Sequence, residues 1–512
     1  INMETAATGD GIGVRVAGTY HGDRTFINTE LTHVVDQIEK DIQKITSLFG
    51  SEHQQVESYL LMTCYRSRLD FVLQNHYPSD TGLHALRFDH ILLKALGNIA
   101  DQDLLAMPFN SLTRTRLRLP AALGGIALHS KVHMRHILFI ATCMKTVRSM
   151  ADHNKKGVNT PGFNSGVSDH YLGTQNYTDF QFFIQGSTLL GREFLDSYNY
   201  ISDIMTSDPP ATWHVGAARA LNSIEGSPQR KLTREWHLFH KKKLDTRMDK
   251  LDPNNGTEEE KQIKRAWLGA QPNSNGRLMT CRPRKDGTGT IPGREWITMF
   301  AIVNALPIPA LRSHYEVTWT KKVKGKRLKH YKCDPYGNAL SASGDKEFRK
   351  YHNFMQSLTL SLALQGGIVA DIEPKNIYLP GISTKIKWDK QNNRQIQGKI
   401  PDMRVIEKAG KIVLYDWKLI SAAEHNYNAN KETKTIKMAA ANRRQDKVHK
   451  EYMDKLKLVD KEYNNTPPIQ RGFWKSGKKA NQPKMVLGEG PVCKMMKRYG
   501  RVKGLVTGFF GE

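Results

Sequence analysis

One stretch decides how the C-terminal part of the chain folds: Ile400-Pro-Asp402-Met-Arg-Val-Ile-Glu-Lys-Ala-Gly410-Lys-Ile-Val-Leu-Tyr-Asp416-Trp-Lys418. Its apolar residues predict two strands joined by a turn, in which Gly410 can adopt the positive φ that hairpins often need. Asp402 and Asp416 have thirteen residues between them and fall on these adjacent strands. Because side chains two apart on a strand point to the same side, we expect Lys418 beside Asp416.

The elements around this hairpin predict an α/β fold with a mixed sheet. A helix with Phe354, Leu358 and Leu362 on one face is expected to end at Gly366-Gly367. The predicted elements after it are strands over 368–373, 403–406 and 411–418, a long basic helix over about 433–463, and an apolar strand over 502–510.

The two acidic residues and the lysine form the pattern PD-x(n)-(D/E)-x-K of the restriction-endonuclease-like nucleases, whose core also has the order helix, three strands, helix, strand. Asp402 and Asp416 are predicted to hold Mg²⁺ or Mn²⁺ through carboxylate oxygens. The metal would generate hydroxide from bound water and stabilise charge on phosphate oxygens. Lys418 would orient that water or neutralise the transition state, Glu373 would be a third acidic ligand, and His352 would contact a phosphate or orient a ligand.

Each of these residues also has a structural interpretation. Asp402 could cap a turn, and Asp416 and Lys418 could form an exposed pair. Glu373 could be an exposed residue before a proline. A histidine at a helix start, such as His352, is more often a surface or capping residue. The bare pattern arises by chance in roughly one chain in ten of this length. The metal site is favoured because the strand up to Asp416 is apolar enough to be buried, and a charged pair at the end of a buried strand needs a partner.

The charge of the chain points to a polyanionic partner. Its 512 residues include 76 Lys and Arg against 50 Asp and Glu, a formal charge of +26, and nucleic acid is the abundant polyanion inside cells. Residues 431–512 hold 20 Lys and Arg against 8 Asp and Glu, an imbalance that favours phosphate binding over a merely solvated helix face. The predicted nucleic-acid contacts are Arg443, Arg444, Lys447 and Lys450 in the long helix, Lys321 and Lys322 in a basic hairpin over 315–331, and Arg114, Arg116 and Arg118.

The part of the chain before the hairpin is predicted to be mainly helical. A Gly-rich stretch over 11–19 suits a short strand pair, and amphipathic spacing predicts helices at about 29–49, 53–75, 86–105 and 131–148. Pro120 and Gly124-Gly125 interrupt a helix, so we expect 114–128 to be an ordered loop. The segment 150–180 is expected to be a flexible connector, and the densely charged segment 226–289 to be solvated helix and loop rather than core.

Composition excludes several classes of protein. Hydrophobic residues make up 39% of the chain, which excludes a wholly disordered or collagen-like protein. The five cysteines are scattered, odd in number and without a C-x-x-C, which argues against a disulfide framework. No apolar run approaches the ~20 residues of a membrane span, so we expect a soluble protein without a membrane partner. Because the chain starts at Ile1 and stops at Glu512 inside a predicted strand, we expect it to be a fragment of a longer product.

Three segments carry a family resemblance. The first is Arg118-Leu-Pro-Ala-Ala-Leu-Gly-Gly-Ile-Ala-Leu-His-Ser130, the second is Cys333-Asp-Pro-Tyr-Gly-Asn-Ala-Leu-Ser341 followed by Arg349-Lys-Tyr-His352-Asn353, and the third is Gly504-Leu-Val-Thr-Gly-Phe-Phe-Gly-Glu512. They resemble segments of LINE-like (non-LTR) retroelement proteins that carry a restriction-like endonuclease. The first segment resembles the one after the reverse-transcriptase palm. The second resembles the Cys/His stretch before the nuclease, and the third resembles the closing strand of the nuclease.

The resemblance implies a multidomain α plus α/β protein. Its implied parts are the end of the reverse-transcriptase palm at 1–50, a helical thumb at 51–150, a connector and helical linker at 151–290, a basic hairpin with a degenerate zinc-knuckle-like region at 291–348, and a restriction-like endonuclease domain with a mixed sheet at 349–512. Cys333 stands alone, with Asn338 and Ala342 where further ligands would be expected, so zinc binding is doubtful.

The implied function is the nicking of target DNA in the nucleus, which exposes a 3′-hydroxyl that primes reverse transcription of the element's RNA. The N-terminal helices would hold the RNA–DNA duplex. No Tyr-x-Asp-Asp occurs in the chain, so polymerase activity is not expected from it alone. Two alternatives stay open: a nucleic-acid-binding remnant whose site has decayed, and a stand-alone repair nuclease, which would leave residues 1–150 unexplained.

Overall fold

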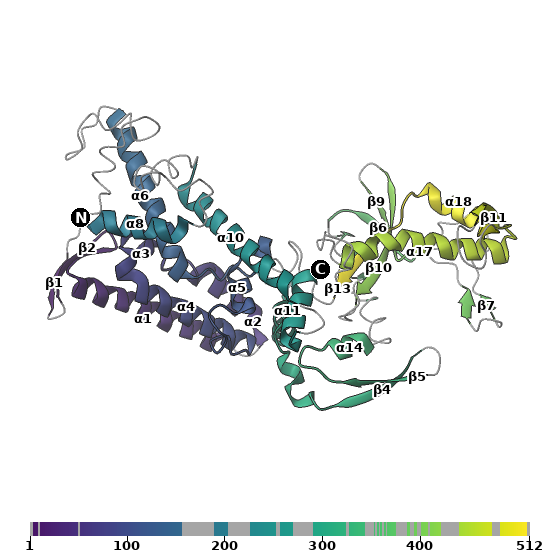
Figure 1. Ribbon diagram of the computed structural model, residues 1–512, viewed down its shortest axis with the longest axis horizontal. Coiled ribbons are helices and arrows are strands. Elements are labelled where there is room, and N and C mark those ends of the chain that lie inside the picture. The colour runs from purple at the N-terminus through teal and green to yellow at the C-terminus, as the bar shows by residue number, and fades with distance from the viewer. Residues whose placement is uncertain are drawn as a thin grey trace. The chain divides into compact units, whose positions relative to one another are not determined.

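The computed structural model describes residues 4–8, 11–49, 52–155, 189–202, 226–251, 256–269, 290–323, 327–343, 353, 356–357, 359–360, 363–364, 366–374, 387–389, 394–396, 401–407, 410–420, 440–473 and 482–508. The chain divides into two compact units. Unit 1 is Ile1–Lys264 with Pro272–Arg312, and unit 2 is Arg265–Gln271 with Ser313–Glu512. Unit 1 is mainly helical and unit 2 combines helices with small sheets, so the predicted mixture of α and β structure is confirmed (Figure 1).

Unit 1 is built from long helices. Helix α1 (Arg24–Leu48) begins before the predicted residue 29 because the Asp23 carboxylate caps it, accepting the Phe26 N–H at 2.8 Å. The further helical elements of the unit are α2 (Gln54–Leu60), the π-helix η2 (Leu61–Tyr65), α3 (Asp70–Asn75), α4 (Pro78–Ala100), α5 (Leu112–Arg118), α6 (Lys131–Lys155), α8 (Leu189–Ile201), α10 (Pro228–Lys250) and α13 (Gly293–Val303), while α11 (Glu258–Gly269) crosses the unit boundary.

One apolar core holds these helices together. Buried side chains of α1, α4, α6 and α13 belong to a single cluster, among them Leu31, Phe88, Leu92, Ile137 and Trp296. The first fifty residues therefore share their core with the helices that follow them. The strands β1 (Glu4–Thr8), β2 (Gly11–Val16) and β3 (Thr19–Gly22) form an antiparallel sheet, which confirms the strand pair predicted from the Gly-rich stretch.

The loop expected over 114–128 is wrong in its first part. Leu112–Arg118 form helix α5, and the Ser111 hydroxyl caps its start by accepting the Arg114 N–H at 3.2 Å. The helix ends before Pro120, where a proline is expected to stop it. Gly124 then adopts a φ of 88°, and a Cβ on Gly125 would lie 2.1 Å from the Leu119 carbonyl oxygen, so the chain closes tightly on itself after α5.

The expectation that 226–289 lies outside the core is wrong for α10. Leu232 and Trp236 are 2% and 8% exposed and belong to the core of unit 1, and the helix packs against α5 and α6. The charged residues hid this face because its buried apolar positions 232, 236, 244 and 248 are few and widely spaced, with a gap of eight residues between 236 and 244.

Unit 2 contains a four-stranded sheet with the order β13-β10-β9-β6. Its strands are β6 (Val369–Ile372), β9 (Met403–Ile406), β10 (Ile412–Ile420) and β13 (Lys503–Gly508). Strand β9 is antiparallel to both neighbours, and β13 is parallel to β10. The three strands, the intervening helix α17 (Ala440–Tyr463) and the last strand therefore follow the predicted order, and residues 433–439 of the predicted helix lie outside the described residues.

The helix before the sheet is described in part. The described residues among 353–364 are helical, and the helix ends as predicted, because Gly367 adopts a φ of 69° and the Ile368 N–H donates to the Ala363 carbonyl at 2.9 Å. The predicted face of Phe354, Leu358 and Leu362 lies outside the described residues.

Helix α17 covers one face of the sheet. Its buried residues Val448, Tyr452 and Leu456 pack in one cluster with Leu414 of β10. Asp460, near the end of α17, accepts the N–H groups of Val492 and Cys493 at 3.0 Å each and so caps α18 (Pro491–Arg498).

The predicted basic hairpin is confirmed as β4 (Thr318–Val323) paired with β5 (Arg327–Lys332). Unit 2 also contains α14 (Asn338–Ser343) and the hairpins β7 (Lys387–Asp389) with β8 (Arg394–Ile396) and β11 (Ile469–Phe473) with β12 (Pro483–Val486). Residues 156–180 of the predicted connector lie outside the described residues. None of the described helices combines the length and the apolarity that a membrane crossing requires.

Candidate functional site

The two predicted metal ligands lie at the same end of the β9–β10 ladder in the sheet of unit 2. The antiparallel ladder ends with Tyr415 opposite Met403, and the next residues along are Asp416 on β10 and Asp402 directly before β9. Asp416 shares the face of Leu414, two residues earlier, which is the face that α17 covers.

Asp416 is buried and ion-paired. Its side chain is 1% exposed, and one of its oxygens accepts the Lys418 ammonium. The same ammonium donates to the Trp417 carbonyl oxygen at 3.0 Å, and the Lys418 side chain is 20% exposed. The expected proximity of Lys418 and Asp416 is therefore present, and the alternative of an exposed pair is wrong, because the acidic partner is buried.

Asp402 closes the end of the ladder. Its carboxylate accepts the Trp417 N–H at 2.5 Å, which is a bond that a backbone carbonyl would make in a continued ladder. Its carbonyl oxygen accepts the Gln356 side-chain amide at 2.7 Å and the Glu373 N–H at 3.0 Å. Backbone and side-chain groups from three segments therefore hold Asp402 in place.

The other predicted residues of the site are less well placed for metal binding. Glu373 follows β6 and reaches Asp402 through its backbone, but its φ of 45° breaks the alternation of the strand and its side chain is exposed. His352 lies outside the described residues. Within the described ranges, no group of three or more His, Cys, Asp or Glu side chains is arranged to hold a metal ion.

The predicted phosphate contacts fall into two groups. Lys447 and Lys450 are exposed on α17, which also contains Arg443 and Arg444, and Lys321 and Lys322 lie on β4. All six therefore belong to unit 2.

The three arginines of α5 need a correction. Arg116 is 1% exposed and donates from Nε to the Gly124 carbonyl at 3.0 Å, and Arg114 is 7% exposed and donates to the Met107 carbonyl at 2.8 Å. Both guanidinium groups hold the chain around α5 and are too buried to form a nucleic-acid surface. Arg118 differs from them, because it opens onto a pocket.

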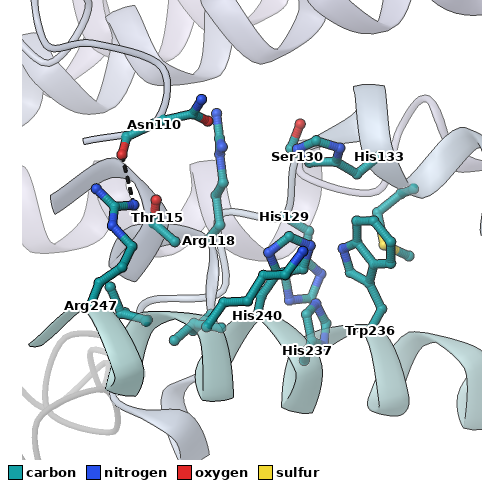
Figure 2. Close-up of a pocket in the computed structure, with 14 residues that line it drawn as sticks. Asn110, Thr115, Arg118, His129, Ser130, His133, Trp236, His237, His240 and Arg247 are labelled. Carbon is teal, nitrogen blue, oxygen red and sulfur yellow. Dashed lines mark hydrogen bonds between the residues drawn. The ribbon is translucent and has the colours of Figure 1, made fainter. Parts of the chain in front are cut away.

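That pocket was not predicted from the sequence. It has a volume of about 270 Å³ and lies between α5, the start of α6 and α10. Figure 2 shows Arg118 and Thr115 on one side, His129, Ser130 and His133 on another, and Trp236, His237 and His240 rising from α10. Residues from three separate segments therefore form one site.

The histidines of the pocket are neutral in the free protein. Burial lowers the pKa of His129 to about 2 and that of His133 to about 3, and it lowers the pKa values of His237 and His240 to about 4. Arg118 contributes to the shifts of His133 and His240, because a nearby positive charge disfavours protonation. Arg118 itself has a pKa lowered by burial to about 10 and keeps its charge at neutral pH.

A signal for this pocket exists in the sequence. His129 and His133 are four residues apart, and His237 and His240 are three apart. Residues at these spacings lie on the same face of a helix, or on that face and the residues just before the helix begins. Only the packing of α10 against α6 brings the two pairs together.

Comparisons with known proteins add no family. A scan of the chain against protein-family models found no match, and a search of curated proteins found none.

Proposed function

We propose that the chain is a metal-dependent DNA endonuclease of the non-LTR retroelement type, which nicks target DNA in the nucleus to prime reverse transcription of an element RNA. The observation that carries the proposal is that Asp402, directly before β9, and Asp416 on β10 lie at the same end of one ladder, with the Trp417 N–H on Asp402 and the Lys418 ammonium on Asp416. The order of elements along unit 2 supports it, because helix, three strands, helix and strand is the order that the nuclease pattern predicts.

The donor set suits a hard divalent cation. Two carboxylates at the same end of the β9–β10 ladder would offer the oxygen ligands that Mg²⁺ or Mn²⁺ takes. Asp402 and Asp416 would hold the ion, which would supply a nucleophilic hydroxide and stabilise charge on the phosphate. The ion would replace the Lys418 ammonium as the partner of Asp416, because the two compete for the same oxygen.

The chain's own residues then have separate tasks. The Trp417 N–H orients the Asp402 carboxylate by donating to one of its oxygens. The displaced Lys418 ammonium, two residues beyond Asp416 on β10, would be placed to neutralise a phosphate oxygen as negative charge develops. Lys447 and Lys450 would attract the DNA backbone without reading its sequence.

The test is a nicking assay on supercoiled plasmid with Mg²⁺ or Mn²⁺. Asp416→Asn is expected to abolish nicking and to leave DNA affinity within about twofold, because the phosphate contacts lie elsewhere. Asp454→Asn removes an equal charge from an exposed position of α17 and is expected to nick normally. Nicking that survives in Asp416→Asn would overturn the proposal.

The folding of the variant needs its own control. Asp416→Asn leaves the Lys418 ammonium without its carboxylate in a mostly buried position, which costs stability. The double variant Asp416→Asn with Lys418→Gln removes both charges and keeps hydrogen-bonding groups. We expect it to fold better than the single variant and to remain inactive.

A second function is favoured by one observation. The charges of Asp402 and Asp416 are already compensated, by the Trp417 N–H and by Lys418, so the site is consistent with a protein that binds nucleic acid without cleaving it. This alternative predicts tight, salt-dependent DNA binding and no nicking by the unmodified chain with either metal.

A further inference from the structure

We propose that the pocket of unit 1 binds a nucleotide, with its phosphate at the mouth on Arg118, Lys243 and Arg247 and its base deeper, against Trp236 and the histidine rings. This inference concerns a different unit from the sheet site. It does not depend on whether the sheet site cleaves DNA.

The charges at the mouth identify an anion as the ligand. Lys243 and Arg247 are exposed at the rim, and Arg118 projects from α5 on the facing side. No acidic side chain occurs among the described residues that line the pocket. The charge of Arg118 interacts with the buried carboxyl group of Asp89, and its guanidinium group lies over the Phe109 ring, 4.0 Å from the ring centroid. Three cationic side chains at the mouth of a pocket whose described lining is free of carboxylates favour a negatively charged ligand.

The floor of the pocket indicates that the ligand is larger than a phosphate group. Leu119, Met134 and Leu244 lie at its base and are at most 6% exposed. Its volume of about 270 Å³ is several times the roughly 30 Å³ that a water molecule occupies in the liquid, and is close to the lower limit of ordinary ligand pockets. An anion at the rim would leave these apolar surfaces uncovered.

The aromatic wall indicates a flat, polar ring. The rings of His129 and His237 lie with centroids 4.4 Å apart, and the His240 ring stands at 60° to that of Trp236 at the same separation. Aromatic and imidazole rings bind nucleobases by stacking and edge contacts. The Nε2 atoms of His129 and His240 are buried, so these two histidines offer ring surface rather than ring nitrogens to a ligand.

A metal ion is a poorer ligand for the same histidines. No set of three His, Cys, Asp or Glu side chains in the described ranges is arranged around a common point. His133 already shares its Nδ1 with the Tyr200 hydroxyl, and the surrounding arginines and lysine repel a cation. The cluster therefore offers rings and positive charge rather than a coordination site.

The test is calorimetric titration of the full chain with adenosine 5′-monophosphate, adenosine and inorganic phosphate as separate probes. We expect the monophosphate to bind at least tenfold more tightly than either part, because it engages both the rim and the aromatic wall. Equal affinity for the monophosphate and for phosphate would overturn the nucleotide assignment, and so would no binding of the monophosphate at millimolar concentration.

Matched lysine variants locate the binding. Lys243→Gln is expected to weaken monophosphate binding roughly tenfold, the effect of losing one hydrogen bond to a charged group. Lys242→Gln changes the neighbouring exposed lysine, which does not line the pocket, and is expected to bind as the unmodified chain does. Equal weakening by both variants would show that binding depends only on the overall positive charge, and it would overturn the assignment of the binding site to the pocket.

Two further arms separate the proposals and the ligand's source. Asp416→Asn should bind the monophosphate normally, so failure of nicking and failure of this pocket are distinguishable. A thymidine oligonucleotide with a 5′-phosphate that competes with the monophosphate, where its unphosphorylated form does not, would assign the pocket to a strand end. If neither oligonucleotide competes with the monophosphate, the pocket is assigned to a free nucleotide. Both results support nucleotide binding in the pocket.

Discussion

Acidification from pH 7 to pH 5 is expected to destabilise unit 1. The histidines of its pocket are neutral in the folded protein, with pKa values lowered by burial to about 2–4, whereas an unfolded histidine has a pKa near 6.5. The unfolded chain therefore binds more protons than the folded one below pH 6.5. By linkage, the free energy of unfolding is greatest above pH 6.5 and falls as the pH drops towards the folded-state pKa values.

His237 illustrates the magnitude. It is 7% exposed, and its folded-state pKa is about 4, lowered first by burial and then by His240 and Arg66. With 1.36 kcal/mol per pKa unit, the drop to pH 5 removes about 2 kcal/mol for this one side chain. The four pocket histidines would together remove up to about 8 kcal/mol, which is comparable with the whole unfolding free energy of a domain.

Two acidic side chains of the unit act in the opposite direction. Burial raises the pKa values of Glu57 and Asp89, so the folded state binds their protons more readily than the unfolded state does. Each can take up only one proton, so they offset part of the loss and do not reverse its sign.

The assay is urea unfolding at pH 7, 6 and 5, with hydrogen exchange of the amides in α6 and α10 to assign the change to unit 1. His237→Gln is expected to reduce the pH dependence below pH 6.5 by about one proton, or about 1.4 kcal/mol per pH unit. The exposed His33 of α1 provides a matched control for the substitution itself, and His33→Gln should cost less stability at pH 7 than His237→Gln. An unfolding free energy that is constant or rises from pH 7 to pH 5 would refute the reasoning.

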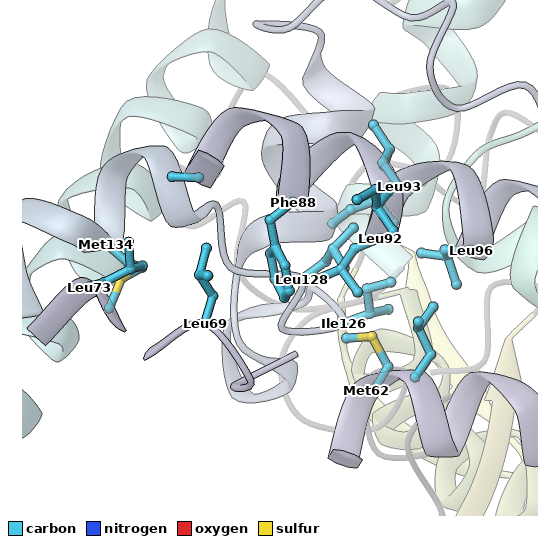
Figure 3. Close-up of a cluster of buried hydrophobic side chains, with 14 of the residues drawn as sticks. Met62, Leu69, Leu73, Phe88, Leu92, Leu93, Leu96, Ile126, Leu128 and Met134 are labelled. Carbon is cyan, nitrogen blue, oxygen red and sulfur yellow. The ribbon is translucent and has the colours of Figure 1, made fainter. Parts of the chain in front are cut away.

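Three further changes test the packing and the charged surfaces. Leu92→Ala, in the core cluster of Figure 3, should cost 2–5 kcal/mol in urea unfolding because Leu92 is 1% exposed, and a smaller loss would mean that the site collapses to fill the cavity. Asp460→Asn should destabilise unit 2 by about 1–3 kcal/mol by weakening two bonds to the start of α18, whereas the exposed Asp454→Asn should change little in the same thermal melt. The double variant Lys447→Gln with Lys450→Gln should reduce the slope of log affinity for DNA against log salt by up to about two, and an unchanged slope would place the phosphate contacts elsewhere.

The sheet of unit 2 was predictable because its signals are local. The hairpin of β9 and β10 follows from alternating apolar residues and a turn with Gly410, which adopts a φ of 73°. Its register places Asp402 and Asp416 at the same end of the ladder without any information from the rest of the chain. The burial of Asp416 depends on α17, which returns from more than twenty residues further along, and only the apolar strand before it hinted at that burial.

The pocket of unit 1 could not be predicted in the same way. Its histidines belong to two short patterns about a hundred residues apart, and nothing in either pattern shows that the two meet in one site. The pocket forms because Trp236 and Leu232 are buried and bring α10 against the rest of unit 1. The dense charge around these two residues predicted a solvated helix instead. In α5, the same difficulty hid Arg116, because a buried arginine bound to a backbone carbonyl has the same sequence signal as an exposed one.

The two sites differ in what ligand binding must cost. At the sheet, a cation has to displace the Lys418 ammonium from Asp416, so the gain from binding is reduced by the loss of an internal ion pair in a buried position. At the pocket, Arg118 and Lys243 raise the positive potential around His240 and help to keep it neutral, so an anion relieves repulsion. The buried apolar side chains that line the pocket lower the local dielectric constant, which strengthens the attraction between the anion and these cations. For the same number of contacts, we therefore expect the pocket of unit 1 to bind its ligand more tightly than the sheet binds its metal. At the sheet, a DNA phosphate would have to become the new anionic partner of the displaced lysine, which would offset the free energy lost with the ion pair.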